Sequence, residues 1–316
     1  MKIVVMGSGG VGGYFGGCLA AAGCDVQFVA RGAHLEAMRT RGLSIHSPEG
    51  DFHLAETKAT DDPGSIGPVD IVLFTVKLYD MEEAARAIRP LLGADTAVIP
   101  FLNGVEAVAA LGQAVGPGHV MGGVAYIFSV IEEPGVIFRI GTMARLLFGE
   151  LDGTASRRAA AFKEACDGAG IAAVLSENVE LDIWKKLVVL AAVAGVTSFT
   201  RQSLGPIRRD PEAAAMLRAA IGETAAVARA RGAALADDAE EAAWTAVSGL
   251  PDDMKSSMLE DLEHGRRLEL AWLNGAVANM GRELGIPTPT NATIAEALAP
   301  HADGADAPGA PSQGSF

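Results

Sequence analysis

Lys2-Ile-Val-Val-Met6 runs directly into Gly7-Ser8-Gly9-Gly10-Val11-Gly12, and this junction decides the fold. The apolar run is typical of a buried parallel strand. The following stretch, Val11 to Ala22, has small and apolar residues at helical spacing and stops at Gly23. Because a strand, a glycine turn and a helix start coincide, the sequence predicts the first β-α-β unit of a dinucleotide-binding sheet.

Each glycine of this turn has a physical role in such a site. Gly7 permits the sharp turn, Gly9 lets the backbone approach a pyrophosphate, and Gly12 lets the helix pack closely on the strand. The free N–H groups and the positive dipole end of the helix then hold the anion. We therefore expect cofactor contacts from Gly7, Ser8, Gly9, Gly10, Val11 and Gly12.

Arg31 follows the second predicted strand, Asp25 to Ala30. An NAD-binding chain places an acidic residue at this distance, where it binds the ribose 2′-hydroxyl. A guanidinium can instead grip a 2′-phosphate bidentately, which favours NADP(H) over NAD. The alternative is that Arg31 is a solvated loop arginine.

Two further predicted strands end at polar side chains. Asp70 to Val76 is a continuous apolar run closed by Lys77, and Thr96 to Leu102 is followed by Asn103. Ligands of doubly wound sheets bind beyond the carboxyl ends of the strands. We therefore expect Lys77 and Asn103 to contact the cofactor.

Length and composition predict an enzyme of two domains. The chain has 316 residues, more than one core usually holds, and 49% are hydrophobic. The formal net charge of -14 argues against nucleic acid or an anionic membrane as partner. The three cysteines and six histidines show no metal-ligand spacing, so we predict no metal.

The N-terminal sequence predicts a cytoplasmic location. Met1-Lys2 leads at once into the first strand, which leaves no room for a signal peptide. The long apolar stretch Leu187 to Val196 is too short to span a bilayer and is typical of a buried helix.

Strand signals vanish from Asn178 onward, where alanine- and leucine-rich helical patterns extend to Glu296. We predict an α/β fold class, with an N-terminal Rossmann-type doubly wound sheet over residues 1–176 and a C-terminal all-helical domain over 177–300. Residues 301–316 are rich in Gly, Pro, Ala and Ser without periodicity, which predicts a disordered tail.

Two charged residues stand out in the helical half. Lys186 lies at the head of a wholly apolar run, where a lysine either snorkels at the rim of a buried helix or points into a cleft. Glu269 lies in the stretch Lys255 to Asn274, which we predict to be a helix of several turns. On spacing alone, a snorkelling lysine and a surface glutamate are the commoner arrangements.

Taken in order, these segments resemble the ketopantoate reductase family (2-dehydropantoate 2-reductases) over nearly the whole chain, up to about Pro300. The motifs that carry the resemblance are Gly7 to Gly12, Arg31, Val76-Lys77, Asn103-Gly104, Pro134-Gly135, Trp184-Lys-Lys-Leu187, Ser256-Ser-Met258, Glu269, Asn274-Gly275 and Thr288-Pro-Thr-Asn291.

The resemblance implies a Rossmann domain and a helical domain with the active site in the cleft between them. NADPH would deliver hydride to the C2 ketone of a 2-keto acid, with ketopantoate, of pantothenate biosynthesis, as first candidate. By similarity, Lys186 is the general acid and Glu269 orients the lysine or the substrate hydroxyl. Asn103 would lie near the nicotinamide ribose and the reaction centre, as the third catalytic residue. Ser257 would bind the substrate carboxylate, and Arg31 and Lys77 would hold the adenosine phosphate.

Three positions depart from the family pattern. Asparagines are expected one and two turns after the lysine and three residues before Ser257, but this chain has Leu190, Ala194 and Met254 there. Losing three polar contacts makes the expected pocket more apolar and changes its discrimination between substrates.

Three alternatives follow from these departures. The first is the same chemistry on a more apolar 2-keto acid, and the second is a non-catalytic NADP-binding sensor or regulatory protein. A 3-hydroxy acid dehydrogenase is the third, but that class needs an asparagine where Leu190 stands. The alanine-rich helices of the second half could also form the face of a homodimer.

Overall fold

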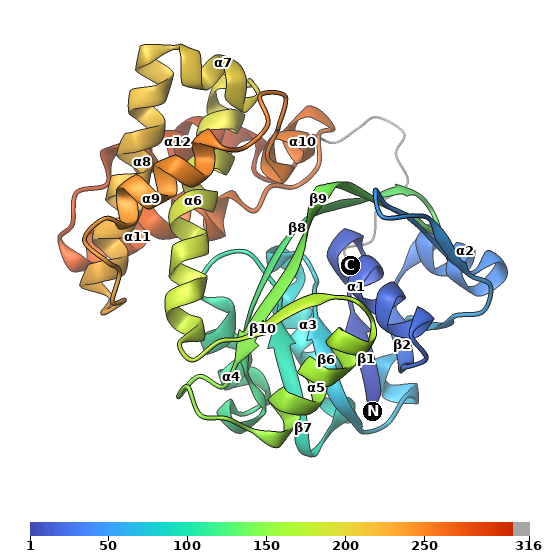
Figure 1. Ribbon diagram of the computed structural model, residues 1–316. Helices are drawn as coiled ribbons and strands as arrows, with labels where there is room; N and C mark the ends of the chain where they lie inside the picture. The colour runs from blue at the N-terminus through green and yellow to red at the C-terminus, as the bar shows by residue number, and fades with distance from the viewer. Residues whose placement is uncertain (306–316) are drawn as a thin grey trace. The chain divides into compact units, whose positions relative to one another are not determined.

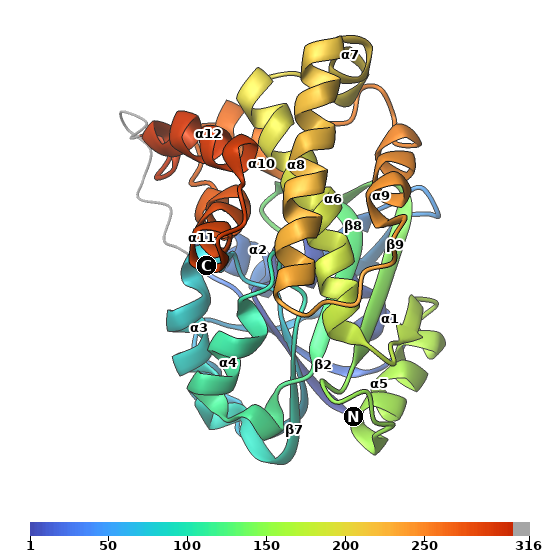
Figure 2. The same ribbon diagram turned by 90° about the vertical axis from the view of Figure 1, so that its left-hand side faces the viewer.

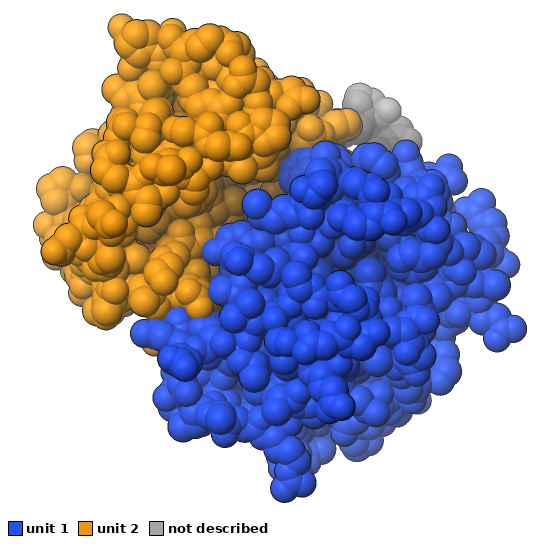
Figure 3. Space-filling model, in the orientation of Figure 1, with its two compact units in different colours: residues 1–102, 106–179, 312–316 blue, residues 103–105, 180–311 orange. Residues whose placement is uncertain are grey.

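The structure is a computed structural model that describes residues 1–305, and these residues form two compact units (Figures 1 and 3). Unit 1 comprises Met1–Leu102 and Glu106–Val179. Unit 2 comprises Asn103–Val105 and the described chain from Glu180 onward. The predicted boundary between residues 176 and 177 thus differs by three positions from the observed one, and Asn103 groups with the helical unit.

Unit 1 is built on a parallel sheet with strand order β5-β2-β1-β6-β7. Its strands are β1 (Lys2–Met6), β2 (Asp25–Val29), β5 (Lys58–Thr60), β6 (Val69–Phe74) and β7 (Leu92–Pro100). The helices of this layer are α1 (Gly10–Ala21), α2 (Gly32–Arg41), α3 (Met81–Ala87) and α4 (Ala107–Val115), with α3 and α4 on one side of the sheet and α1 on the other (Figure 2). Strand order reverses at β1, which confirms the predicted doubly wound sheet.

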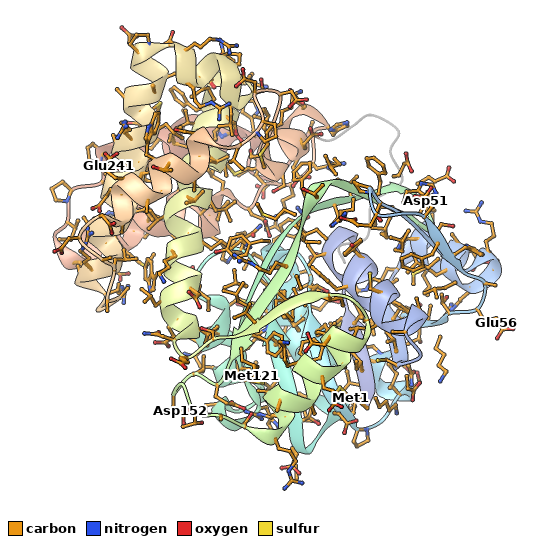
Figure 4. The ribbon with its side chains drawn as sticks, viewed as in Figure 1. Met1, Asp51, Glu56, Met121, Asp152 and Glu241 are labelled. Atoms are coloured by element: carbon orange, nitrogen blue, oxygen red, sulfur yellow. The ribbon has the colours of Figure 1, made fainter. Side chains whose placement is uncertain are left out.

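A second sheet in unit 1 has the order β10-β9-β3-β4, with β8 paired to β9. Its strands are β3 (Leu43–His46), β4 (Phe52–Leu54), β8 (Gly122–Glu133), β9 (Val136–Gly149) and β10 (Ala172–Leu175), and α5 (Arg157–Gly168) precedes β10. Strands β3 and β4 are antiparallel. In the chain, Asp51 precedes β4 and Glu56 follows it, and both residues are labelled in Figure 4.

Helix α1 contacts strands of both sheets, which explains its unusual glycine content. A Cβ on Gly12 would lie 2.3 Å from the carbonyl oxygen of Gly7, on the side of the parallel sheet. A Cβ on Gly13 would lie 2.8 Å from the side chain of Ile137, in the second sheet. Both distances are well inside van der Waals contact, so these faces of the helix pack closely only with glycine.

Unit 2 is helical, which confirms the predicted fold class of the second half. Its α-helices are α6 (Val179–Thr200), α7 (Leu204–Arg209), α8 (Pro211–Ala230), α9 (Ala239–Ser248), α10 (Ser257–Glu263), α11 (Asn274–Leu284) and α12 (Pro289–Leu298), with the 3-10 turns η5 (Leu270–Trp272) and η6 (Ala299–His301). Helix α6 runs alongside α8 (Figure 2), and apolar residues of both belong to one core. Residues 187–196 of α6 are apolar on all sides because most of them are buried in that core.

The single helix predicted over Lys255 to Asn274 is wrong. Helix α10 ends at Glu263, Gly265 follows with a positive φ of 65°, and the chain continues to η5 before α11 begins. In the gap, the N–H of Leu268 donates to the carbonyl of Ala302 over 2.8 Å. This long-range bond replaces the helical bonds that the sequence pattern would otherwise allow.

The predicted disordered tail also begins too early. Residues 301–305 are ordered against unit 2, since His301 ends η6 and the N–H of Ala305 donates to the carbonyl of Gly265 over 2.9 Å. The rest of that prediction, residues 306–316, lies outside the described residues. Among the described helices, none is long and apolar enough to cross a membrane.

Candidate active site

The glycine turn after β1 has the conformation of an anion-binding turn. Gly7 has a φ of 95°, and a Cβ there would lie 2.8 Å from the backbone nitrogen of Val76. Gly9 differs, since its φ is -71° and a Cβ there would meet no atom of residues 1–305 within 4 Å. Neither backbone strain nor packing against the described residues requires glycine at position 9. A ligand that approaches the backbone closely would require glycine here, because a side chain would obstruct it.

The start of α1 offers unpaired donors next to this open space. Gly9 is the N-cap without a side-chain cap, and the first helical bond runs from Gly13 N to Gly9 O over 2.6 Å. Within residues 1–305, the N–H groups from Gly9 to Gly12 have no hydrogen-bond partner. Four free donors at the positive end of a helix suit a pyrophosphate.

Ser8 takes part in the turn through its backbone rather than its hydroxyl. Its side chain is buried, and the hydroxyl donates to the carbonyl of Val29 over 3.0 Å. The N–H groups of Gly7 and Ser8 donate to the same carbonyl over 3.2 and 3.1 Å. These bonds tie the turn to the end of β2 and leave no hydroxyl proton for a ligand.

Arg31 and Lys77 follow the two strands that neighbour β1 in the sheet. Their positions therefore share the edge of the sheet at which the glycine turn lies. The guanidinium of Arg31 pairs with Glu83 over 2.8 Å, and its side chain is 32% exposed. An ion pair this exposed contributes little stability, so Arg31 can exchange the carboxylate for a phosphate.

Unit 2 brings together the three residues that the sequence analysis names as catalytic. The Lys186 ammonium donates to Oδ1 of Asn103 over 3.0 Å. Nδ2 of Asn103 donates to Oε2 of Glu269 over 3.0 Å. The asparagine therefore presents its acceptor to the cation and its donor to the anion, which satisfies both ends of the amide.

The local structure explains how these side chains meet. Lys186 lies on α6 and is half-buried, and Asn103 follows β7. Glu269 is only 6% exposed because the break after α10 places it at the start of η5. The commoner surface arrangement of this glutamate is therefore wrong, and the lysine ammonium bonds to an amide instead of extending to the rim of its helix.

Burial lowers the pKa of Lys186 to about 8, and the negative charge of Glu269 opposes that shift. An ammonium with this pKa loses its proton more readily than an exposed lysine does. It is therefore suited to act as a general acid near neutral pH.

Ser257 is the first residue of α10 and is half-buried. Its neighbour Ser256 caps the helix by accepting from Leu259 N over 3.0 Å, and the hydroxyls of Ser256 and Thr197 are 2.7 Å apart. The Thr197–Ser256 pair fixes the start of α10 against α6. This role of Ser256 was not predicted from the sequence, although a serine before a helical pattern is a usual cap signal.

The three positions at which the family pattern has asparagine are apolar in their surroundings as well. Ala194 is buried in the helical core, and Leu190 and Met254 are partly buried against it. Leu190 and Ala194 follow Lys186 at one and two helical turns, so they share its face of α6. In residues 1–305 there is no group of three or more His, Cys, Asp or Glu side chains that could hold a metal.

Comparison with known proteins covers both units. The profile described as "Ketopantoate reductase PanE/ApbA" matches residues 3–153, and the profile of its C-terminal part matches residues 178–302. A 2-dehydropantoate 2-reductase of Archaeoglobus fulgidus is 33% identical over 93% of this chain and 95% of its own length. An uncharacterized oxidoreductase of Bacillus subtilis, YkpB, is 33% identical over 93% of this chain and 96% of its own.

Solved structures agree with the sequence comparisons. The crystal structure of 2-dehydropantoate 2-reductase from Geobacter metallireducens superposes with a TM-score of 0.89 at 29% identity, covering 95% of this chain and 99% of the other. The profiles match nearly the whole described chain, and the relatives share its length. The chain therefore belongs to the ketopantoate reductase family.

Proposed function

We propose that this chain is an NADPH-dependent 2-keto acid reductase that converts ketopantoate to pantoate. Membership of the family makes it an oxidoreductase that acts on CH–OH groups with a nicotinamide cofactor. The observation that carries the proposed mechanism is the hydrogen-bonded series Lys186, Asn103 and Glu269. A chain that only senses NADP would have no use for a half-buried lysine paired in this way.

The residues of unit 1 fit a dinucleotide. The four N–H groups from Gly9 to Gly12, which have no partner among the described residues, would hold the pyrophosphate. No described atom fills the space beside Gly9, so that space can admit it. Arg31 would hold the 2′-phosphate by leaving Glu83, and Lys77 would add positive charge at the same edge of the sheet. These two cations are our reason to propose NADPH rather than NADH.

When bound, NADPH supplies the hydride that adds to C2 of the keto acid. Negative charge then develops on the carbonyl oxygen, and the Lys186 ammonium donates its proton there. The ammonium favours the transition state over the ground state because the charge on oxygen is larger in the transition state. Glu269 keeps Lys186 protonated and, through Asn103, holds it in position.

Ser257 would bind the substrate carboxylate from the start of α10. Its hydroxyl has no partner among the described residues, and the Thr197–Ser256 pair holds the backbone that carries it. Leu190, which is only partly buried, would form an apolar wall one turn after Lys186, with the buried Ala194 behind it. We propose that this wall contacts the gem-dimethyl part of ketopantoate, which needs no polar partner.

A panel of 2-keto acids with NADPH tests this function. We expect turnover of ketopantoate with NADPH at a kcat/KM at least as high as for any apolar analogue. A higher kcat/KM for a bulkier, wholly apolar 2-keto acid would favour the alternative substrate. NADPH binding without oxidation by any member of the panel would favour the sensor instead. A cytoplasmic location and a homodimer stay predictions, which cell fractionation and light scattering can test.

A further inference from the structure

His34 lies in the first turn of α2, and both of its ring nitrogens contact backbone groups that are distant in the sequence. Nε2 is 2.9 Å from the carbonyl oxygen of Ser8, in the glycine turn. Nδ1 is 3.1 Å from the backbone N–H of Gly135, in the turn between β8 and β9. One imidazole thus joins three segments of unit 1.

The two partners determine the tautomer of this ring. Because the N–H of Gly135 is a donor, Nδ1 must accept and carries no proton. The ring proton then resides on Nε2, from which it is donated to the carbonyl of Ser8. Burial lowers the pKa of His34, in keeping with a neutral ring.

The bond from His34 fixes a peptide that faces the anion site. The C=O and N–H of a trans peptide point in opposite directions. With the Ser8 carbonyl directed at His34, the N–H of Gly9 points away from it and has no partner within residues 1–305. The N–H and hydroxyl of Ser8 are already held by Val29, so the carbonyl is the remaining polar group to be fixed.

We propose that His34 is a positioning residue that holds the Ser8–Gly9 peptide in the orientation that receives the cofactor pyrophosphate. Without it, this peptide can rotate, because Gly9 has no side chain to restrict it. The Pro134-Gly135 turn holds His34 in place. Gly135 has a φ of 87° and donates to the ring, so the turn fixes the imidazole plane.

Two substitutions distinguish the bond of His34 to Ser8 from its bond to Gly135. The test rests on the proposed function, because it assumes that the glycine turn binds NADPH. In His34→Gln, the side-chain amide can reach the Ser8 carbonyl as Nε2 does. In His34→Asn, the shorter side chain can reach only Gly135. We expect His34→Asn to weaken NADPH and ADP binding roughly tenfold, measured by calorimetry, and His34→Gln to bind both within about twofold of wild type.

His53→Asn is the matched control, because the sole hydrogen bond of that exposed histidine within residues 1–305 is to the hydroxyl of Ser44. It should leave NADPH affinity unchanged. Thermal unfolding of each variant separates lost affinity from lost folding. Wild-type affinity in His34→Asn, or an equal loss in both His34 variants, would overturn the assignment of His34. Failure of wild type to bind NADPH or ADP would instead overturn the proposed function.

The tautomer gives a test that needs no variant. Nitrogen-15 NMR of the ligand-free protein at pH 7 should show the His34 proton on Nε2. A proton on Nδ1 would contradict the bond to Ser8 and overturn the proposal, even if the variants proved too unstable to assay.

Discussion

The ammonium of Lys186 and the amide oxygen of Asn103 form a hydrogen bond of 3.0 Å, although the two residues are 83 positions apart. Asn103 follows the last strand of the parallel sheet yet belongs to the helical unit. Asn103 was expected to contact the cofactor, and Lys186 was expected to donate the proton. The hydrogen bond between them places both side chains in one group.

The pH profile should report the titration of Lys186. Its pKa is lowered to about 8 by burial, and reduction requires the protonated form. The kcat/KM for the keto acid should therefore be constant below that pKa and fall tenfold per pH unit above it. Oxidation of the hydroxy acid needs the neutral amine and should show the opposite limb. A reduction rate that rises through pH 8 to 9 would contradict this assignment.

Glu269→Gln should shift that limb to lower pH. The charge of Glu269 raises the pKa of Lys186, so its removal lowers the pKa further. The glutamine retains an oxygen that can accept from Asn103. Glu263→Gln is the control, since that residue pairs with Lys255 across the surface of unit 2. An unshifted limb in Glu269→Gln would show that the two charges are not coupled.

Arg31→Ala should raise the KM for NADPH about tenfold or more and leave the KM for NADH nearly unchanged, because only NADPH carries the 2′-phosphate. Glu83→Gln should lower the KM for NADPH modestly, since it releases the guanidinium from its ion pair. Arg39→Ala, which removes another exposed pair of α2, serves as the control. Equal effects of Arg31→Ala on both cofactors would assign Arg31 to something other than the 2′-phosphate.

Gly9→Ala and Gly12→Ala should separate ligand binding from stability. A Cβ on Gly9 would meet no atom of the described residues within 4 Å, whereas one on Gly12 would lie 2.3 Å from the carbonyl of Gly7. We expect Gly9→Ala to unfold near the wild-type temperature but to bind NADPH weakly. Gly12→Ala should lose about 1–3 kcal/mol of unfolding free energy, measured by urea denaturation. The reverse pattern would contradict the close packing of α1 on β1.

Much of unit 1 could be predicted from its sequence, because the decisive contacts are local. The glycine turn, the strand before it and the helix after it lie within the first 21 residues, and the structure has β1 and α1 there. The packing of α1 between two sheets could not be predicted. It depends on where β8 and β9 lie, more than 100 positions later in the chain.

The environment of the predicted catalytic residues was not predictable from spacing. Apolar residues at helical spacing continue across the break after α10, so the pattern could not show that the helix ends at Glu263. That break buries Glu269 and allows its bond to Asn103, 166 positions away. His34 was missed for the same reason, since both of its partners are backbone atoms of distant turns.

The most direct test of the account is NADPH oxidation with ketopantoate by wild type, Lys186→Ala and Lys185→Ala. Lys185 is the neighbouring exposed lysine, paired with Asp182, and serves as the control. We predict that Lys186→Ala binds NADPH with wild-type affinity but turns over at least about 100-fold more slowly, while Lys185→Ala keeps wild-type turnover. Wild-type turnover by Lys186→Ala would contradict the role of Lys186 as the proton donor.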